Sequence, residues 1–139
     1  MPGTSVRIVD EQGNPVNFGG GGGTTPTPKD VTLQNAASAA GNGTAFAPTD
    51  GNYTLTFEIT GTSTSRAVNF ELAGPSGTYM PTTAYNVSDP SKYGPSTTGG
   101  NNSAPESWQV EVPAGYSFRA RISSVAGGTV TVKGKAVMG

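Results

Sequence analysis

The acidic side chains are the groups with which any chemistry in this chain would have to begin. The chain contains no histidine and no cysteine, so the commonest general base, the thiol nucleophile and the soft metal ligands are missing. What remains is general acid–base catalysis by a pair of carboxylates, as in glycoside hydrolysis. The candidates are Asp10, Glu11, Asp50, Glu58, Glu71, Glu106 and Glu111.

Several of these carboxylates stand where a solvated surface charge is expected. Glu58, Glu71 and Glu111 alternate with apolar residues and therefore fall on the polar faces of expected strands. Asp50 precedes Gly51-Asn52, which is the usual place of an aspartate in a turn. The aspartates also lack the alternate spacing of a calcium loop. We therefore expect no catalytic residues, no metal site and no cofactor, and we expect that the chain is not an enzyme.

Aromatic side chains suggest binding instead of catalysis. Tyr79, Tyr85 and Tyr93 flank or occupy residues 84–105, a segment rich in Tyr, Asn and Pro that reads as irregular. Loops of this length usually carry a function or are disordered, and a tyrosine combines a large contact area with a polar tip. The three tyrosines could face a protein neighbour or the rings of a glycan, and a solvated loop is the plain alternative. Trp108 begins an alternating strand and is expected in the core.

Residues 1–30 are expected to form an arm and not a domain. A strand-and-turn stretch is followed by five glycines at positions 19–23 and then by Thr-Thr-Pro-Thr-Pro. Five glycines lose much backbone entropy on ordering, and no helix follows that could complete a phosphate-binding loop. We interpret the glycines as a linker. The expected partner contacts of the arm are its apolar residues Val6, Ile8, Val9, Val16 and Phe18.

Residues 31–139 are expected to form one β domain. Apolar and polar residues alternate with the period of two that places one face of a strand on a core. This pattern covers residues 53–60, 68–72, 108–112, 116–123 and 129–137, and weaker strand candidates are 31–37 and 44–47. Residues 61–65 are predicted to close a hairpin, and no helix of ten or more residues is predicted. The pattern predicts an all-β, antiparallel β-sandwich, Ig-like or jelly-roll-like, with an extended N-terminal arm.

The composition excludes several partners. Eight basic and nine acidic residues are scattered singly, with a net charge of −1, so no basic patch is present to bind nucleic acid. No stretch approaches the 18 apolar residues of a membrane span, and the N-terminus lacks the charged-then-apolar pattern of a signal peptide. We expect a protein made in the host cytoplasm that binds neither nucleic acid nor membrane.

A family resemblance adds to this interpretation. The arm opening at residues 5–16, followed by a glycine-rich linker, resembles the N-terminal segment of tailed-bacteriophage virion accessory proteins. The stretches that resemble their β-sandwich modules are residues 31–37, 41–45, 58–62, 118–122 and 127–134. The resemblance implies a non-enzymatic virion part. It suggests either a capsid decoration or head-fibre protein, or a tail or baseplate component.

We therefore expect a capsid decoration protein that lies on the capsid surface of the virion. Its partners would be the major capsid protein and other copies of itself, as a homo-oligomer, with a trimer favoured by the resemblance. The alternative is a tail, baseplate or fibre module that binds host-surface glycans through Tyr79, Tyr85 and Tyr93.

Overall fold

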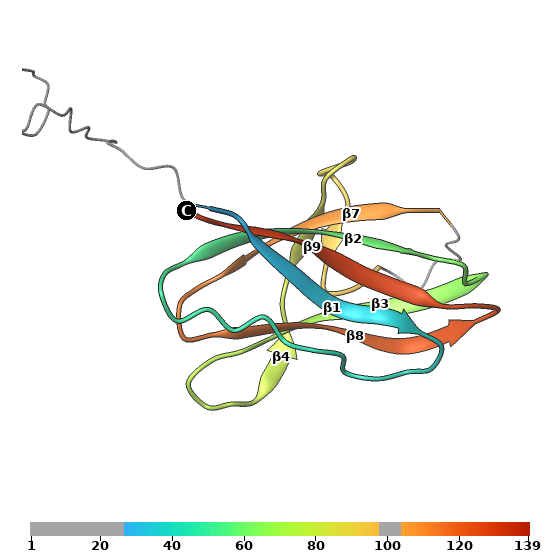
Figure 1. Cartoon of the computed structure of the whole chain (residues 1–139), viewed down its shortest axis with the longest axis horizontal. Coiled ribbons are helices and arrows are strands. Elements are labelled where there is room, and N and C mark those ends of the chain that lie inside the picture. The colour runs from blue at the N-terminus through green and yellow to red at the C-terminus, as the bar shows by residue number, and fades with distance from the viewer. Residues whose placement is uncertain (1–26, 98–103) are drawn as a thin grey trace, which may run out of the picture.

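The fold is all β. The computed structural model describes residues 27–97 and 104–139, and this part of the chain forms nine strands and no helix (Figure 1). The strands are β1 (Lys29–Ala37), β2 (Tyr53–Gly61), β3 (Ser65–Ala73), β4 (Tyr79–Pro81), β5 (Ala84–Asn86), β6 (Tyr93–Gly94), β7 (Glu106–Val112), β8 (Ser117–Ala126) and β9 (Val130–Met138). The apolar residues of the arm, from Val6 to Phe18, lie outside the described residues.

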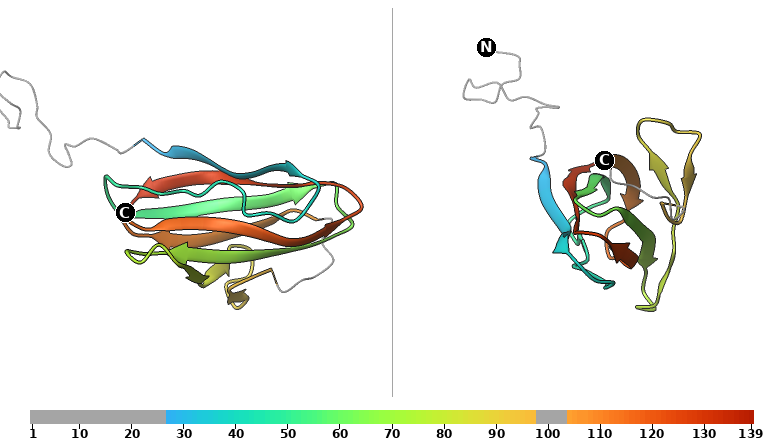
Figure 2. Two further views of the ribbon diagram at one scale, coloured as in Figure 1. Left: turned by 90° about the horizontal axis from the view of Figure 1, so that it is seen from below. Right: turned by 90° about the vertical axis from the view of Figure 1, so that its right-hand side faces the viewer.

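The strands form two sheets that pack face to face. One sheet has six strands in the order β1-β9-β2-β7-β5-β6, and the other has three in the order β4-β3-β8. Every pairing is antiparallel. Figure 2 shows the long strands of the two layers running along the same axis. The predicted antiparallel sandwich is confirmed.

The core lies between the sheets and follows the alternation in the sequence. Leu55, Phe57 and Ile59 of β2 are fully buried, and Phe57 packs against Phe70 with ring centroids 5.5 Å apart. Trp108 is buried, as predicted, and its ring centroid lies 5.1 Å from that of Phe70. These aromatic side chains fill the space between the layers.

The predicted hairpin at residues 61–65 is wrong. Strands β2 and β3 belong to different sheets, so this loop crosses from one layer to the other. The backbone amides of Thr62 and Ser63 donate to the carbonyl oxygen of Thr129, which ties the crossing to the β8–β9 turn. A period of two shows which face of a strand is buried, but it does not show which strand lies beside it.

The two weaker strand candidates have different outcomes. The first is confirmed as β1, which begins at Lys29 and so includes the last two residues assigned to the arm. The second, residues 44–47, forms only an isolated bridge in which Phe46 and Phe118 exchange backbone hydrogen bonds of 2.8 and 2.9 Å. Together with a similar bridge between Gly41 and Ile122, it covers the outer edge of β8.

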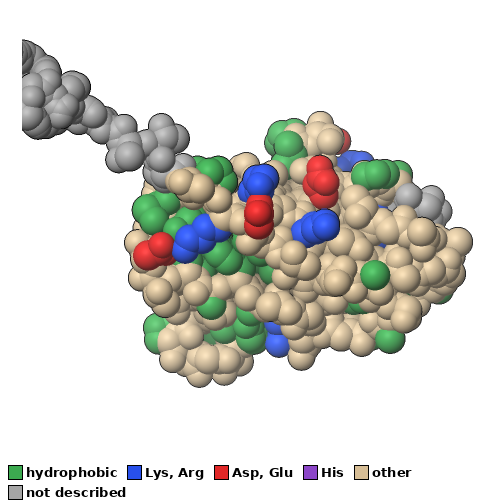
Figure 3. Space-filling view, viewed as in Figure 1, with side chains coloured by type: hydrophobic (Ala, Val, Ile, Leu, Met, Phe, Trp, Pro, Cys, Tyr) green, Lys and Arg blue, Asp and Glu red, His purple; other side chains and the backbone are tan. Residues whose placement is uncertain are grey.

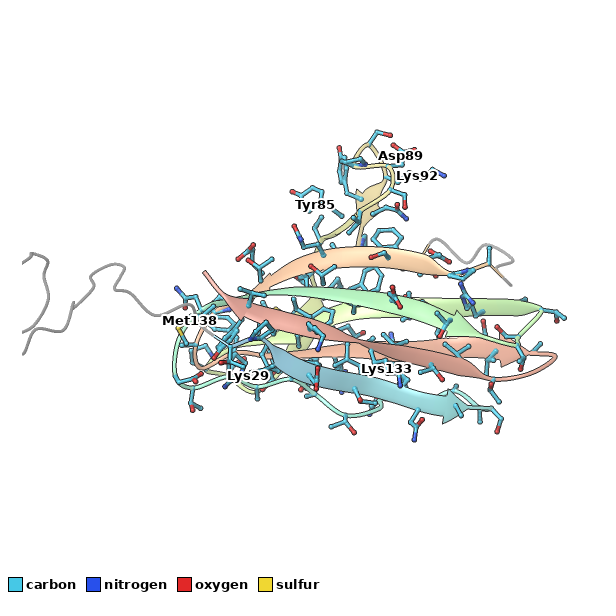
Figure 4. All side chains as sticks on the ribbon, turned by 45° about the horizontal axis from the view of Figure 1, so that its top comes forward. Lys29, Tyr85, Asp89, Lys92, Lys133 and Met138 are labelled. Atoms are coloured by element: carbon cyan, nitrogen blue, oxygen red, sulfur yellow. The ribbon has the colours of Figure 1, made fainter. Side chains whose placement is uncertain are left out.

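The expectation of an irregular segment over residues 84–105 needs correction. Residues 84–94 form a small hairpin of β5 and β6 that pairs with β7 and projects from the body (Figure 4). These strands have three and two residues, which is too short for any periodicity to show in the sequence.

Candidate binding face

The outer face of the six-stranded sheet carries a continuous row of polar and aromatic side chains. The strand register places one residue from each strand in line, and we call this line the binding row. Its members are Asp30, Lys135, Thr56, Gln109, Tyr85 and Tyr93, in order from β1 to β6. Thr56 is partly exposed and the other five are exposed. The row therefore crosses the whole sheet at right angles to the strands.

Hydrogen bonds between neighbouring strands fix several side chains of this face. The amide nitrogen of Gln109 donates to Oγ1 of Thr56 at 3.0 Å. Two residues along the same two strands, the hydroxyl of Thr54 donates to Oε2 of Glu111 at 2.8 Å. Lys135 forms an ion pair with Asp30 at the β1 end of the row. The polar groups of the face are thus held in defined positions.

Two hollows lie along this face. The larger, of about 660 Å³, is lined by Asp30, Val31, Thr32, Thr56, Glu58, Ser107, Lys133, Gly134 and Lys135. The smaller, of about 240 Å³, is lined by Thr82, Thr83, Tyr85, Gln109, Val110 and Glu111. The binding row contributes to both, because Thr56 borders the first and Gln109 borders the second.

Two of the three candidate tyrosines come together on this face. Tyr85 and Tyr93 are cross-strand partners in the β5–β6 hairpin, with ring centroids 5.7 Å apart. Tyr79 lies apart from them on β4, in the other sheet, where the guanidinium of Arg119 stands 3.9 Å from its ring centroid. The structure therefore separates Tyr79 from the aromatic pair.

Several of the candidate carboxylates are engaged with neighbouring side chains, and the candidates do not form one group. Glu71 accepts bonds from Nε of Arg119 at 2.8 Å and Nε of Arg121 at 3.0 Å, on the outer face of the smaller sheet. Asp50 pairs with Lys29 at the end of the sandwich, at 3.0 Å. Asp10 and Glu11 lie outside the described residues, and no described group of three or more acidic residues is placed to hold a metal ion.

Electrostatic surroundings lower the pKa of several carboxyls. Hydrogen bonds from Arg121 and then Arg119 hold the pKa of Glu71 below its ordinary value, against the opposing effect of burial. Lys29 lowers the pKa of Asp50, and Lys135 lowers that of Asp30. A general acid for catalysis needs a raised pKa, so none of these three groups is tuned for that role.

Arg66 is a buried charge that no feature of the sequence singles out. Its side chain is fully buried and reaches from β3 across to the other sheet, where Nη2 lies 2.5 Å from the carbonyl oxygen of Ala104. The same nitrogen lies 3.2 Å from Oε2 of Glu106, whose other oxygen accepts from the indole of Trp108 at 3.0 Å. An arginine at the start of an alternating strand looks like any surface residue in the sequence.

Comparison with known proteins shows the family. Residues 27–136, which are nearly all of the described sandwich, match the family model XepA. The chain belongs to the XepA family. No curated protein sequence matches it, and within residues 27–97 and 104–139 no helix is long and apolar enough to cross a membrane.

Two crystal structures resemble this XepA-family chain over 82% of its length. The SPBc2 prophage-derived protein YomS is 29% identical with a TM-score of 0.71, and 96% of that chain is covered. The PBSX exported protein XepA is 30% identical with a TM-score of 0.72, but this chain spans only 39% of its length. Both names indicate a phage origin, which agrees with the phage class implied by the sequence resemblance.

Proposed function

We propose that this XepA-family protein is a non-enzymatic structural protein of a phage particle that decorates the capsid surface. The observation that carries the proposal is the engagement of several of its acidic groups with basic side chains. Glu71, Asp50 and Asp30 are each paired with basic side chains and have lowered pKa values. With these three carboxylates occupied in this way, we expect the domain to act through surface contact and not through proton transfer.

The arm supplies attachment in this proposal. Its apolar residues, from Val6 to Phe18, would add a strand-like segment to the major capsid protein, and the five glycines would join that anchor to the sandwich. The domain would be displayed outward as a homotrimer. The phage origin of the two structural relatives supports the particle as the setting.

Deletion of residues 1–23 tests the proposal. Phage particles assembled with the full chain or with the truncated chain are purified, and copies per particle are counted by quantitative mass spectrometry. We expect hundreds of copies of the full chain and loss of the truncated chain, which still folds by circular dichroism. Normal incorporation of the truncated chain contradicts the role of the arm, and a handful of copies of the full chain indicates a tail or baseplate component.

A second candidate is a phage product that acts outside both the cell and the particle. The name of the PBSX relative, an exported protein, favours it. Fractionation of an induced culture separates the two candidates, because a decoration protein sediments with the particles and a released protein stays in the supernatant.

A further inference from the structure

We infer that the binding row is a recognition site for an uncharged glycan chain lying across the strands, with its most specific contacts at Tyr85 and Tyr93. This inference goes beyond capsid attachment. It concerns the outer face of the six-stranded sheet and needs no contribution from residues 1–26.

The aromatic end of the row is exposed and held in place. The exposed fractions of Tyr85 and Tyr93 are 53% and 64%, which are high values for such large apolar rings. Their backbones are aligned with the sheet because Tyr85 is paired both with Tyr93 and with Gln109 of β7. A sugar ring has an apolar C–H face and a polar rim, so it matches the apolar body and polar tip of a tyrosine.

The hydrogen-bonding groups that a sugar needs lie directly beside this pair. Because Gln109 donates to Oγ1 of Thr56, its amide oxygen remains an acceptor and the threonine hydroxyl keeps its own hydrogen to donate. Glu111, fixed through Oε2 by Thr54, retains Oε1. Donors and acceptors held in advance lose little freedom when a ligand binds. The 240 Å³ hollow contacts Tyr85, Gln109 and Glu111 together.

The length of the row favours a chain of several sugars over a single one. Six strands at a spacing of about 4.8 Å place its two ends about 24 Å apart. The 660 Å³ hollow lies toward the β1 end and is bordered by hydroxyl groups, including those of Thr32, Thr56 and Ser107. A linear glycan could contact the aromatic pair and this hollow at once.

The charged side chains on the outer face of the six-stranded sheet do not favour the binding of a polyanion. Lys133 and Lys135 lie beside Glu58 and Asp30 in the strand register, so the two signs alternate. Figure 3 shows acidic and basic side chains side by side on this face, without a region in which one sign of charge dominates. A phosphate-bearing polymer needs clustered positive charge, whereas a neutral glycan does not.

The test uses the full chain and an array of purified bacterial surface glycans, with uncharged polysaccharides, peptidoglycan strands and phosphate-bearing teichoic acids. We expect saturable binding to at least one uncharged glycan, and backbone NMR shifts that follow β9, β2, β7 and β5. The double variant Tyr85→Ala/Tyr93→Ala should weaken this binding roughly tenfold or more, which is the loss of one or two ring contacts. Gln109→Ala should also weaken it.

Tyr79→Ala is the matched control, because it removes a tyrosine from the other sheet and should leave glycan binding unchanged. Thermal unfolding verifies that each variant folds.

Three results would overturn the inference: no glycan retained on the array, equal binding by the double variant, or binding restricted to teichoic acids. Dissociation of an oligomer by the double variant, seen by analytical ultracentrifugation, would also overturn it by assigning the pair to a subunit contact. Incorporation into particles is measured separately, so failure here leaves the capsid proposal intact.

Discussion

Gly134 of β9 lies so close to Thr56 of β2 that a Cβ atom at position 134 would collide with the carbonyl oxygen of Thr56. The same Cβ would stand 2.5 Å from the Cα atom of Phe57. Both neighbours are backbone atoms of a central strand and cannot turn aside as a side chain would. This glycine therefore sets how closely the two strands approach under the larger hollow.

Substitution of Gly134 by alanine should destabilise the fold. We expect a loss of about 1–3 kcal/mol or more in the free energy of unfolding, because the backbones of β2 and β9 must separate. Urea unfolding measures the change. Gly41→Ala is the control: a Cβ there meets no heavy atom within 4 Å, so a similar loss in both variants would contradict this explanation.

Replacement of Arg66 by methionine should remove a link between the two sheets. The methionine fills a similar volume but leaves the carbonyl of Ala104 and the carboxylate of Glu106 without this donor. We expect a loss of about 2–4 kcal/mol in the free energy of unfolding, measured with urea. Lys92→Met, at an exposed position in the β5–β6 hairpin, should change stability by less than about 0.5 kcal/mol. An equally small effect at Arg66 would show that the buried charge does not hold the sheets together.

Glu71 should make stability depend on pH in the acid range. Its pKa in the folded protein is lowered by Arg121 and Arg119, so the unfolded chain binds a proton more readily than the native one. Stability is then fully present above the ordinary glutamate pKa of about 4.3, and is lost as the pH falls through the lower native value. Glu71→Gln should cost about 1–2 kcal/mol at pH 7.

The difference between wild type and Glu71→Gln should shrink as the pH falls through the lowered native pKa of Glu71, since both proteins then carry a neutral side chain. Urea unfolding across this pH range measures it. A difference that stays constant with pH would mean that the variant acts through packing and not through charge.

Hydrogen exchange should divide the larger sheet into a slow centre and a fast end. Strand β2 is paired along its length with β7 and β9, whereas β5 contacts β7 through two register pairs. We expect the amide of Phe57 to exchange only on global unfolding and that of Asn86 to exchange through local opening. Similar protection at both amides, measured by NMR, would show that the hairpin opens only with the whole domain.

The long strands could be predicted from the sequence because their buried faces repeat every second residue. Leu55, Phe57 and Ile59 show this directly. The sheet to which each strand belongs could not be predicted, as the loop at residues 61–65 demonstrates, since one alternation fits either layer. The short strands β5 and β6 carry too few residues for a period.

The candidate site was only partly visible in the sequence. The sequence indicates Tyr85 and Tyr93 as tyrosines of a long segment, and it places Tyr79 near them in the chain although the fold separates it from them. Only the register shows that Gln109 and Thr56 stand in line with the pair. The burial of Arg66 could not be predicted, because it depends on contacts with the opposite sheet, which no local pattern encodes.

The pairing of Lys29 with Ala136 has a practical consequence. The first and last strands of the sandwich are neighbours, and the chain enters β1 and leaves β9 at the same pole of the domain (Figure 1). Because its two ends lie close together, such a module can be inserted into a surface loop of a host protein through two short linkers. The two host residues that flank the insertion then remain near each other. The domain can therefore be inserted as a unit into engineered fusion proteins.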